Sequence, residues 1–241
     1  MYSLQYTFMN DIVWKRYKRS DNQFLLTSGI DIWRIIVSSN LNLIEQFNEI
    51  LHDDEQARAS RFHQKKDTER FLISRIVLRK LLAGYSDQLA ENIKFYEGQN
   101  KKPFSDLKNL RFNLSHSADM IMIAIANEEI GIDIEKIDMD FSYKEILPHN
   151  FGKDENEFIK KAEDFYLLWT RKEALLKATA KGIDDDLPHV PSLDGTYNFN
   201  DGELGLSKSW VIKSFKAEKD YIGSIAYSMK NDRVNFYDVV F

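Results

Sequence analysis

Three carboxylates and one lysine stand inside otherwise apolar segments of this chain of 241 residues. Asp133 and Glu135 alternate with isoleucines, and residues two apart in a strand point to the same face. Trp169, Glu173 and Lys177 follow one another at intervals of four, which places them along one stripe of a helix. If this strand and this helix meet, three acidic oxygen donors converge beside an ammonium group. Magnesium prefers hard oxygen ligands completed by water and substrate phosphates, so the pattern indicates magnesium-assisted phosphate chemistry.

Each half of this pattern has a simpler explanation when it is taken alone. Glu173 and Lys177 could be a surface pair that stabilises a helix by roughly 0.2–0.5 kcal/mol and does nothing else. Asp133 and Glu135 could be the solvent-facing side of an edge strand. The functional interpretation therefore depends on the two halves occurring together with the further motifs below.

The composition narrows the chemistry and the compartment. The chain has no cysteine, which excludes disulfides, thiolate zinc sites and iron–sulfur clusters. A hydrophobic content of 43% supports a substantial core, and no apolar run is long enough to cross a bilayer. The first residues lack the basic and apolar regions of a secretory signal, so we expect a soluble cytoplasmic protein. The net charge of −5 gives no reason to expect nucleic-acid binding.

One basic segment stands out in this acidic chain. It contains Arg58, Arg61, Lys65, Lys66, Arg70, Arg75, Arg79 and Lys80. A solvated helix face explains such a segment, and so does a local anion site, which would suit a polyphosphate ligand better than a long nucleic acid.

The elements that must position these residues follow from periodicity. We expect helices over residues 53–83, with Asp67 as the N-cap of the second half, and over residues 154–181, closed by Gly182. Strands are expected at residues 32–37, 93–96, 110–114, 120–126, 130–137, 210–215, 221–227 and 234–240, with a loop over residues 97–107. This order repeats strands and a helix on both sides of a polar turn at residues 127–129, which favours an α+β fold of two halves.

The chain resembles the Sfp-like 4′-phosphopantetheinyl transferases from about residue 53 to residue 182. The similarity rests on the carboxylate strand and helix above and on three earlier blocks. These are Arg61-Phe62 through Arg70, Lys102-Pro103, and Phe112-Asn113-Leu114-Ser115-His116-Ser117. The resemblance implies two similar α/β halves related by a pseudo-twofold axis, with the active site in the cleft between them. We place the halves at residues 1–128, with the coenzyme A-binding basic helix and the Ser-His loop, and 129–241, with the magnesium-binding strand and the catalytic helix.

Members of this family transfer the 4′-phosphopantetheine arm of coenzyme A to a serine hydroxyl of an acyl or peptidyl carrier protein and release adenosine 3′,5′-bisphosphate. By resemblance, Asp133, Glu135 and Glu173 would bind Mg²⁺, with Asp133, Glu173 and Lys177 as the catalytic residues. Glu173 is the candidate general base, and Lys177 would neutralise charge on the diphosphate.

The resemblance also implies a set of coenzyme A contacts, namely Arg58, Arg61, Lys102, Ser115, His116 and Lys177. Arg70 and Lys172 match family positions as well, where a structural role is equally compatible. Two positions depart from the family pattern, because Lys101 and Ala118 stand where relatives often have glycine. Glycine permits backbone angles that other residues disfavour, so the two loops are expected to hold coenzyme A differently.

The rival chemistries lack their motifs. The chain has no Gly-x-Ser-x-Gly segment for a serine hydrolase, no glycine-rich phosphate loop, and five histidines without metal-ligand spacing. The remaining alternative is a non-catalytic coenzyme A or nucleotide-binding module of the same fold.

The carrier protein is the expected partner, and no nucleic acid or membrane is expected. An apolar cluster after the acidic strand would either pack in the core or meet a carrier helix; its members are Phe141, Tyr143, Ile146, Leu147 and Phe151. A cleft formed within one chain favours a monomer.

Overall fold

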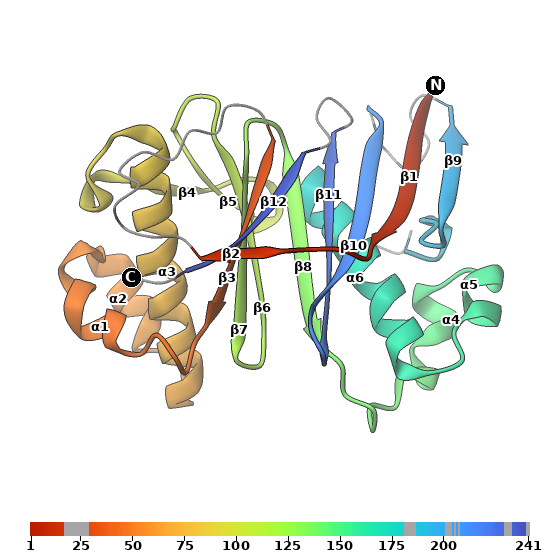
Figure 1. Ribbon diagram of the computed structural model, residues 1–241, viewed down its shortest axis with the longest axis horizontal. Helices are drawn as coiled ribbons and strands as arrows, with labels where there is room; N and C mark the ends of the chain where they lie inside the picture. Colours follow the sequence, from red (N-terminus) through yellow and green to blue (C-terminus); the bar gives the residue numbers. More distant parts are fainter. Residues whose placement is uncertain are drawn as a thin grey trace.

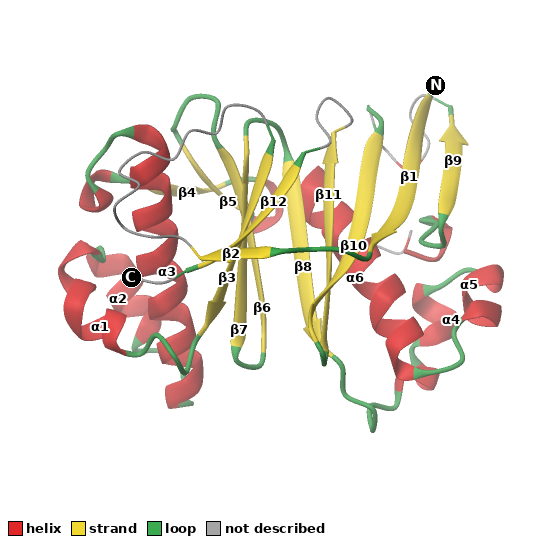
Figure 2. Cartoon of the chain, in the orientation of Figure 1, coloured by secondary structure: helices red, strands yellow, loops and turns green. Residues whose placement is uncertain are grey.

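Two packed β-sheets with helices on their outer faces make up the part of the protein that the computed structural model describes, residues 1–16, 29–180, 187–200, 204, 206, 208–228 and 233–239 (Figures 1 and 2). The strands are β1 (Tyr2–Met9), β2 (Trp14–Arg16), β3 (Ile30–Ile36), β4 (Phe95–Glu97), β5 (Pro103–Ser105), β6 (Arg111–Ser117), β7 (Met120–Ala126), β8 (Ile130–Lys136), β9 (Gly195–Phe199), β10 (Trp210–Glu218), β11 (Tyr221–Ser228) and β12 (Val234–Asp238). The α-helices are α1 (Asn42–Phe47), α2 (Asp53–Ala59), α3 (Lys65–Ser86), α4 (Leu147–Asn150), α5 (Lys153–Phe158) and α6 (Ala162–Thr179). Short 3₁₀ helices lie at Asn48–Ile50, Ala90–Asn92, Gln99–Lys101, Tyr143–Glu145 and Leu187–His189.

The strand order is β2-β12-β3-β7-β6 in the first sheet and β8-β11-β10-β1-β9 in the second. Helix α3 covers the outer face of the first sheet, and α6 covers that of the second. The expected α+β fold with two similar halves is therefore confirmed.

Strand β7 explains why the first sheet is buried on both faces. Its side chains at even positions, such as Met122, join the core between the two sheets, whereas those at odd positions, such as Ile123, pack under α1 and α3. Every residue of β7 is buried. A continuous apolar run is what a strand buried on both sides requires. Strand β8 has the same inner face but places Gly131, Asp133 and Glu135 on its outer face, toward α6.

The strands near the ends of the chain cross between the halves. Strand β1 pairs parallel with β10 in the second sheet, and β12 pairs parallel with β3 and β2 in the first (Figure 1). The boundary between residues 128 and 129 remains our proposal for where the first half of the sequence ends and the second begins. In space, each sheet contains one terminal strand from the other side of that division.

Both long predicted helices are interrupted. The segment predicted as one helix over residues 53–83 forms α2 and α3, and the residue before α3 is Gln64, so the prediction of Asp67 as an N-cap is wrong. The segment over residues 154–181 forms α5 and α6. The carboxylate of Asp164 accepts hydrogen bonds from the backbone of Lys160 and Lys161 and so starts a new helix. Gly182 lies outside the described residues.

Two strand assignments also need correction. The loop predicted over residues 97–107 contains β5, which pairs with β4 in a small hairpin. The Ser115-His116-Ser117 segment belongs to β6 itself and does not follow it. Within the described parts of the chain, no helix combines the length and apolar character needed to span a bilayer.

Candidate active site

A glycine brings the acidic strand and the helix of the second sheet into direct contact. A β-carbon on Gly131 of β8 would lie 2.0 Å from the carbonyl oxygen of Ala174 and 2.4 Å from the amide nitrogen of Ala178, both in α6. Only a residue without a side chain allows this approach. The close contact lets Asp133, two residues along β8, reach the lysine of the last turn of α6, as the sequence pattern predicted.

Asp133, Ser115 and Lys177 form a closed triangle of hydrogen bonds. The Lys177 ammonium donates to Asp133 Oδ1 at 2.6 Å and to Ser115 Oγ at 2.9 Å, and Ser115 Oγ donates to the same Asp133 oxygen at 2.8 Å. Asp133 and Ser115 are buried, whereas 30% of the Lys177 side chain is exposed. The triangle joins β6, β8 and α6, and Lys177 is its partly exposed member.

A second pair continues the join between the two sheets. Ser117 of β6 donates to Glu135 Oε2 at 2.8 Å and accepts from the backbone of Lys136 at 3.0 Å. Farther along, the amide of Ile132 donates to Asn113 Oδ1 at 2.8 Å. Hydroxyl and amide side chains of β6 therefore bind the neighbouring edge strand β8. Burial, and then the nearby charge of Asp133, raise the pKa of Glu135.

Glu173 has the most perturbed carboxyl group of the cluster. Its Oε1 is buried and has no hydrogen-bond partner in the described structure, and the same is true of Asp133 Oδ2. Burial is the main reason that the pKa of Glu173 rises to about 7. The charges of Asp133 and Glu135 raise it further, while the Lys177 ammonium lowers it. A carboxyl group with such a pKa can accept a proton near neutral pH.

The cluster fits a magnesium ion that shares its ligands with a substrate. No group of three acidic or histidine residues in the described ranges is arranged as a ready-made metal site. Magnesium, however, is commonly bound by one or two carboxylates together with water and substrate phosphates. The unpaired buried oxygens of Asp133 and Glu173 are donors of that kind, and the repulsion between the acidic side chains favours a cation.

A cavity of about 430 Å³ lies between helices α2 and α3 and strand β6. Its lining is of mixed charge: the cations are Arg58, Arg70, Arg75 and Lys101, the carboxylates are Asp54, Glu55, Asp67 and Glu97, and Asn113 and His116 are also part of it. Asn113 also binds β8, so the cavity and the carboxylate cluster share a wall. Partial burial and the neighbouring Arg70 guanidinium lower the pKa of His116, which leaves the ring neutral at pH 7.

Several residues of the basic segment form ion pairs or ring contacts within the first half. Arg79 and Arg75 approach the buried carboxylate of Glu55 at 2.7 and 3.7 Å, and Arg70 pairs with Asp67 at 2.7 Å. Arg58 stacks its guanidinium over the ring of Phe71. Of the predicted coenzyme A contacts, Arg58 and His116 line the cavity, Ser115 and Lys177 belong to the triangle, and Arg61 is an exposed residue after α2.

Lys172, by contrast, lies entirely inside the second half. Its ammonium donates to Glu155 and to the backbone oxygens of Leu187 and Val190 at 2.7–2.8 Å, and its side chain is 1% exposed. This geometry supports the structural one of its two predicted roles, because the contacts tie α6 to the segment that follows it.

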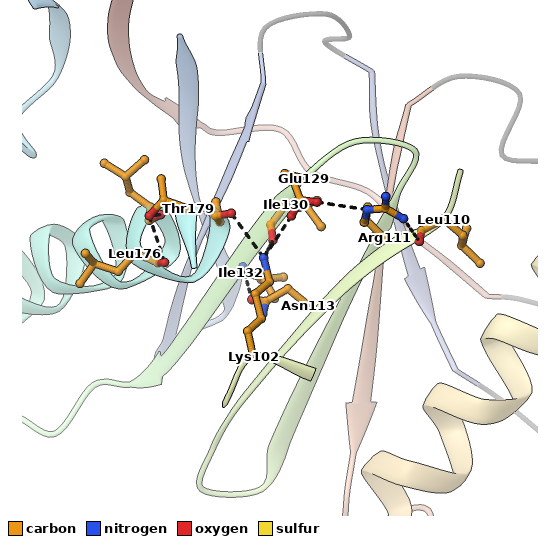
Figure 3. A network of polar contacts seen from close by, with 11 residues as sticks. Lys102, Leu110, Arg111, Asn113, Glu129, Ile130, Ile132, Leu176 and Thr179 are labelled. Carbon is orange, nitrogen blue, oxygen red and sulfur yellow. Dashed lines mark hydrogen bonds and ion pairs between the residues drawn. The ribbon is translucent and has the colours of Figure 1, made fainter. Parts of the chain in front are cut away.

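Lys102 lies in a third polar network, shown in Figure 3. Its ammonium donates to the backbone oxygens of Ile130 and Ala178 and lies 3.5 Å from Glu129 Oε2. Glu129 in turn accepts from Arg111 at 3.1 Å. The coenzyme A contact of Lys102 remains a prediction, and the observed partners of its ammonium are groups of the second half.

The two departures from the family pattern occur where the backbone is left-handed. Lys101 has φ 59° and Ala118 has φ 47°, conformations that glycine adopts readily and other residues at a cost. Both loops therefore have the backbone that glycine would favour although neither position is glycine.

Three residues of the site were not singled out from the sequence as site residues: Asn113, Ser117 and Gly131. The alternation of Asn113, Ser115 and Ser117 along one strand was the available signal, because residues two apart share a face. Gly131 directly precedes the acidic alternation, and a glycine inside a strand often marks a close approach of another backbone.

The predicted apolar cluster is mostly core. Tyr143 and Phe151 are buried around Phe165, and Ile146 and Leu147 pack against them. Phe141 is 40% exposed and contacts the ring of Phe165 at the edge of this core.

These features define an α+β protein with a cavity of mixed charge beside β6 and an acidic cluster where two sheets meet. The sequence of residues 39–128 matches the family model described as 4′-phosphopantetheinyl transferase, N-terminal, and residues 129–226 match that of the 4′-phosphopantetheinyl transferase superfamily. The chain belongs to the 4′-phosphopantetheinyl transferase family and is similar to its Sfp-like members.

Individual relatives carry the same name. The 4′-phosphopantetheinyl transferase HetI of Nostoc is 33% identical over 67% of this chain and 73% of its own length. A putative 4′-phosphopantetheinyl transferase of Synechocystis is 35% identical over 61% of this chain and 64% of its own. The 4′-phosphopantetheinyl transferase Sfp of Bacillus subtilis is 30% identical over 58% of this chain and 64% of its own. The matched region thus spans 64–73% of the length of these relatives.

Proposed function

We propose that this protein transfers the 4′-phosphopantetheine arm of coenzyme A to a serine hydroxyl of an apo acyl or peptidyl carrier protein. The observation that carries the proposal is the Asp133–Ser115–Lys177 triangle beside Glu173, where buried oxygens of Asp133 and Glu173 have no hydrogen-bond partner among the described residues. A carboxylate that can accept a proton and a cation held by an acidic cluster are the groups that such a transfer requires. The family of the chain supports this choice of reaction.

In the proposed reaction the oxygen of the carrier serine forms a bond to the phosphorus that bears pantetheine. The bond from that phosphorus to the bridging oxygen of the diphosphate breaks, and adenosine 3′,5′-bisphosphate leaves with the bonding electrons. Glu173 accepts the proton of the serine, directly or through water, and the Lys177 ammonium offsets the charge that develops on the phosphate oxygens. No covalent intermediate with the protein is needed.

Asp133, Glu135 and Glu173 are the proposed holders of Mg²⁺, which when bound would neutralise and orient the diphosphate. Because the Lys177 ammonium already contacts Asp133 Oδ1, the free oxygen of that carboxylate is the one we assign to the metal.

The cavity beside β6 is the proposed site of the nucleotide end of coenzyme A. Arg58 and Arg70 are the cations of its lining that we assign to the phosphates, although carboxylates such as Asp67 partly balance their charge, and exposed Arg61 follows α2. His116 is neutral at pH 7 and can therefore donate to or accept from a phosphate or a base without adding charge. Ser115 and Lys177 would meet the diphosphate at the triangle.

The carrier protein would approach the partly exposed Lys177 from the side of the second half. Exposed Phe141 lies close in sequence to the acidic strand and is the proposed apolar contact for a carrier helix. We propose a monomeric enzyme, because both halves of a single chain contribute to the site. The cytoplasm, where coenzyme A is available, is the proposed compartment.

The test is the intact mass of an apo carrier protein after incubation with the protein, coenzyme A and Mg²⁺. A mass gain of one phosphopantetheine that EDTA and Glu173→Gln both abolish would support the proposal. If several unrelated carriers gain no mass although coenzyme A binds, the non-catalytic binding module is the better interpretation. Absence of coenzyme A binding would contradict both.

A further inference from the structure

The tip of the β4–β5 hairpin contacts the C-terminal end of α6. The side-chain amide of Asn100 donates to the Ala180 carbonyl at 2.9 Å, and the Lys102 ammonium donates to the Ala178 carbonyl at 3.3 Å. The last carbonyls of a helix have no partner within the helix and carry the negative end of its dipole. An amide and an ammonium are suitable partners for them. The hairpin of the first half thus caps the catalytic helix of the second.

The same ammonium holds the beginning of β8. It donates to the Ile130 carbonyl at 3.2 Å and pairs with Glu129 at 3.5 Å, while Arg111 fixes Glu129 from the other side (Figure 3). An ammonium group has three protons, and Lys102 has three such acceptors. Only 16% of its side chain is exposed. Lys102 therefore joins α6 to β8 at the end where the two elements meet.

The backbone of the hairpin tip is shaped to present these two side chains. Asn100 and Lys101 are both left-handed, with φ of 50° and 59°, and Gly98 and Lys102 close the turn by a hydrogen bond of 2.9 Å. Consecutive left-handed residues other than glycine are costly, so the turn must be stabilised by contacts elsewhere. The bonds to α6 and β8 are contacts of this kind.

Lys177 directly precedes Ala178 in α6, and Asp133 lies three residues after Ile130 in β8. We propose that Asn100 and Lys102 are positioning residues that fix the end of α6 against β8 and thereby set the distance between Lys177 and Asp133. This inference rests on the proposed function, because it assigns a role in catalysis to a contact remote from the reacting atoms. Under it, Lys102 acts through the protein and does not bind a phosphate of coenzyme A.

The two roles of Lys102 predict different kinetics. A phosphate ligand contributes to the binding of coenzyme A, so its loss would raise the Kd for coenzyme A and leave the helix unchanged. A positioning residue contributes to the geometry of the reacting groups, so its loss would lower kcat with little change in that Kd. The helix end would also open more often, which hydrogen exchange measures without any reaction.

The variants are Lys102→Met, which keeps the stem of the side chain, Lys102→Arg as the conservative replacement, and Asn100→Ala at the exposed tip. Lys108→Met, an exposed lysine on the loop after the hairpin, is the matched control. For Lys102→Met we expect amide exchange in the last turn of α6 to quicken by about tenfold and kcat to fall by about tenfold, the size expected when bonds to a helix end are lost. Lys102→Arg should restore most of both.

Asn100→Ala should show the same pattern to a smaller extent, and it keeps the test open if Lys102→Met does not fold. A tenfold higher Kd for coenzyme A in Lys102→Met, with unchanged exchange in α6, would overturn the proposal in favour of a phosphate ligand. Unchanged exchange and unchanged kcat in both variants would overturn it as well. If the wild-type protein transfers nothing to any carrier, the proposed function fails. Amide exchange in the last turn of α6 and the Kd for coenzyme A would then still decide whether Asn100 and Lys102 fix the end of α6 against β8.

Discussion

Replacing Glu173 by glutamine should make the protein more stable and less active. The substitution keeps the size of the side chain but removes a carboxyl group that is buried among Asp133 and Glu135 with one oxygen unpaired. The loss of a general base typically lowers the rate by about 10²–10⁴-fold. The gain in stability comes from the same cause, because an isolated negative charge in this place is unfavourable.

The size of the gain follows from the raised pKa. Between pH 4.5 and about 7, folded Glu173 retains a proton that the unfolded chain has released. The folded state then binds more protons than the unfolded state, so wild-type stability falls as pH rises through this window. The pKa change corresponds to on the order of 3 kcal/mol, lost in full only above pH 7. Glutamine does not ionise and should lose nothing.

Urea unfolding at intervals from pH 5 to pH 8.5, with EDTA present, measures this difference directly. The free energy of unfolding of Glu173→Gln minus that of wild type should increase with pH and level off above pH 7. Glu157→Gln, a substitution at an exposed carboxylate of α5, controls for the loss of a helix charge. A stability difference that does not change with pH, or a variant less stable than wild type at pH 8, would refute the conclusion that the ionised Glu173 carboxylate destabilises the folded protein.

Three further substitutions test other parts of the site. Gly131→Ala should destabilise the protein by roughly 3 kcal/mol or more, because its β-carbon would overlap Ala174 of α6; unchanged urea unfolding would show that the helix can shift. Phe141→Lys should raise the KM for the carrier but leave the Kd for coenzyme A unchanged, whereas Leu89→Lys, at another exposed apolar residue, should affect neither. Ala118→Gly should raise stability by about 1 kcal/mol, because φ 47° favours glycine; a lower Tm would mean that the loop gains nothing from the change.

The acidic cluster was predictable because its signals are local. Alternation in the strand and four-residue spacing in the helix each determine which side chains share a face. An apolar strand with acidic side chains and an apolar helix with a lysine on one face tend to pack together. Asp133 and Lys177 do meet in the structure, at 2.6 Å. The interrupted helices were missed for a related reason, since the apolar periodicity persists through breaks such as residues 60–64, where packing and capping decide.

The exchange of terminal strands could not be predicted, because no local pattern specifies it. Strand β1 pairs in parallel with β10, which lies near the other end of the chain, and the pairing depends on how the rest of the sheet has folded. The position of Lys102 was unpredictable for the same reason. The Lys102 ammonium donates to the carbonyl oxygens of Ile130 and Ala178, and tertiary contacts determine where this backbone lies. Every residue has a carbonyl oxygen, so the sequence does not indicate which of them will accept a hydrogen bond.

The location of the site follows from the way in which the two sheets meet. Strand β6 ends one sheet and β8 ends the other, and an edge strand leaves backbone groups without partners. Here side chains supply what a backbone ladder would have supplied, since Asn113 accepts from Ile132 and Ser117 accepts from Lys136. A join made by side chains leaves room for charged residues that a continuous sheet would exclude. The acidic cluster therefore lies where the fold needs polar side chains, and changes to Asn113 or Ser117 should alter stability and catalysis together.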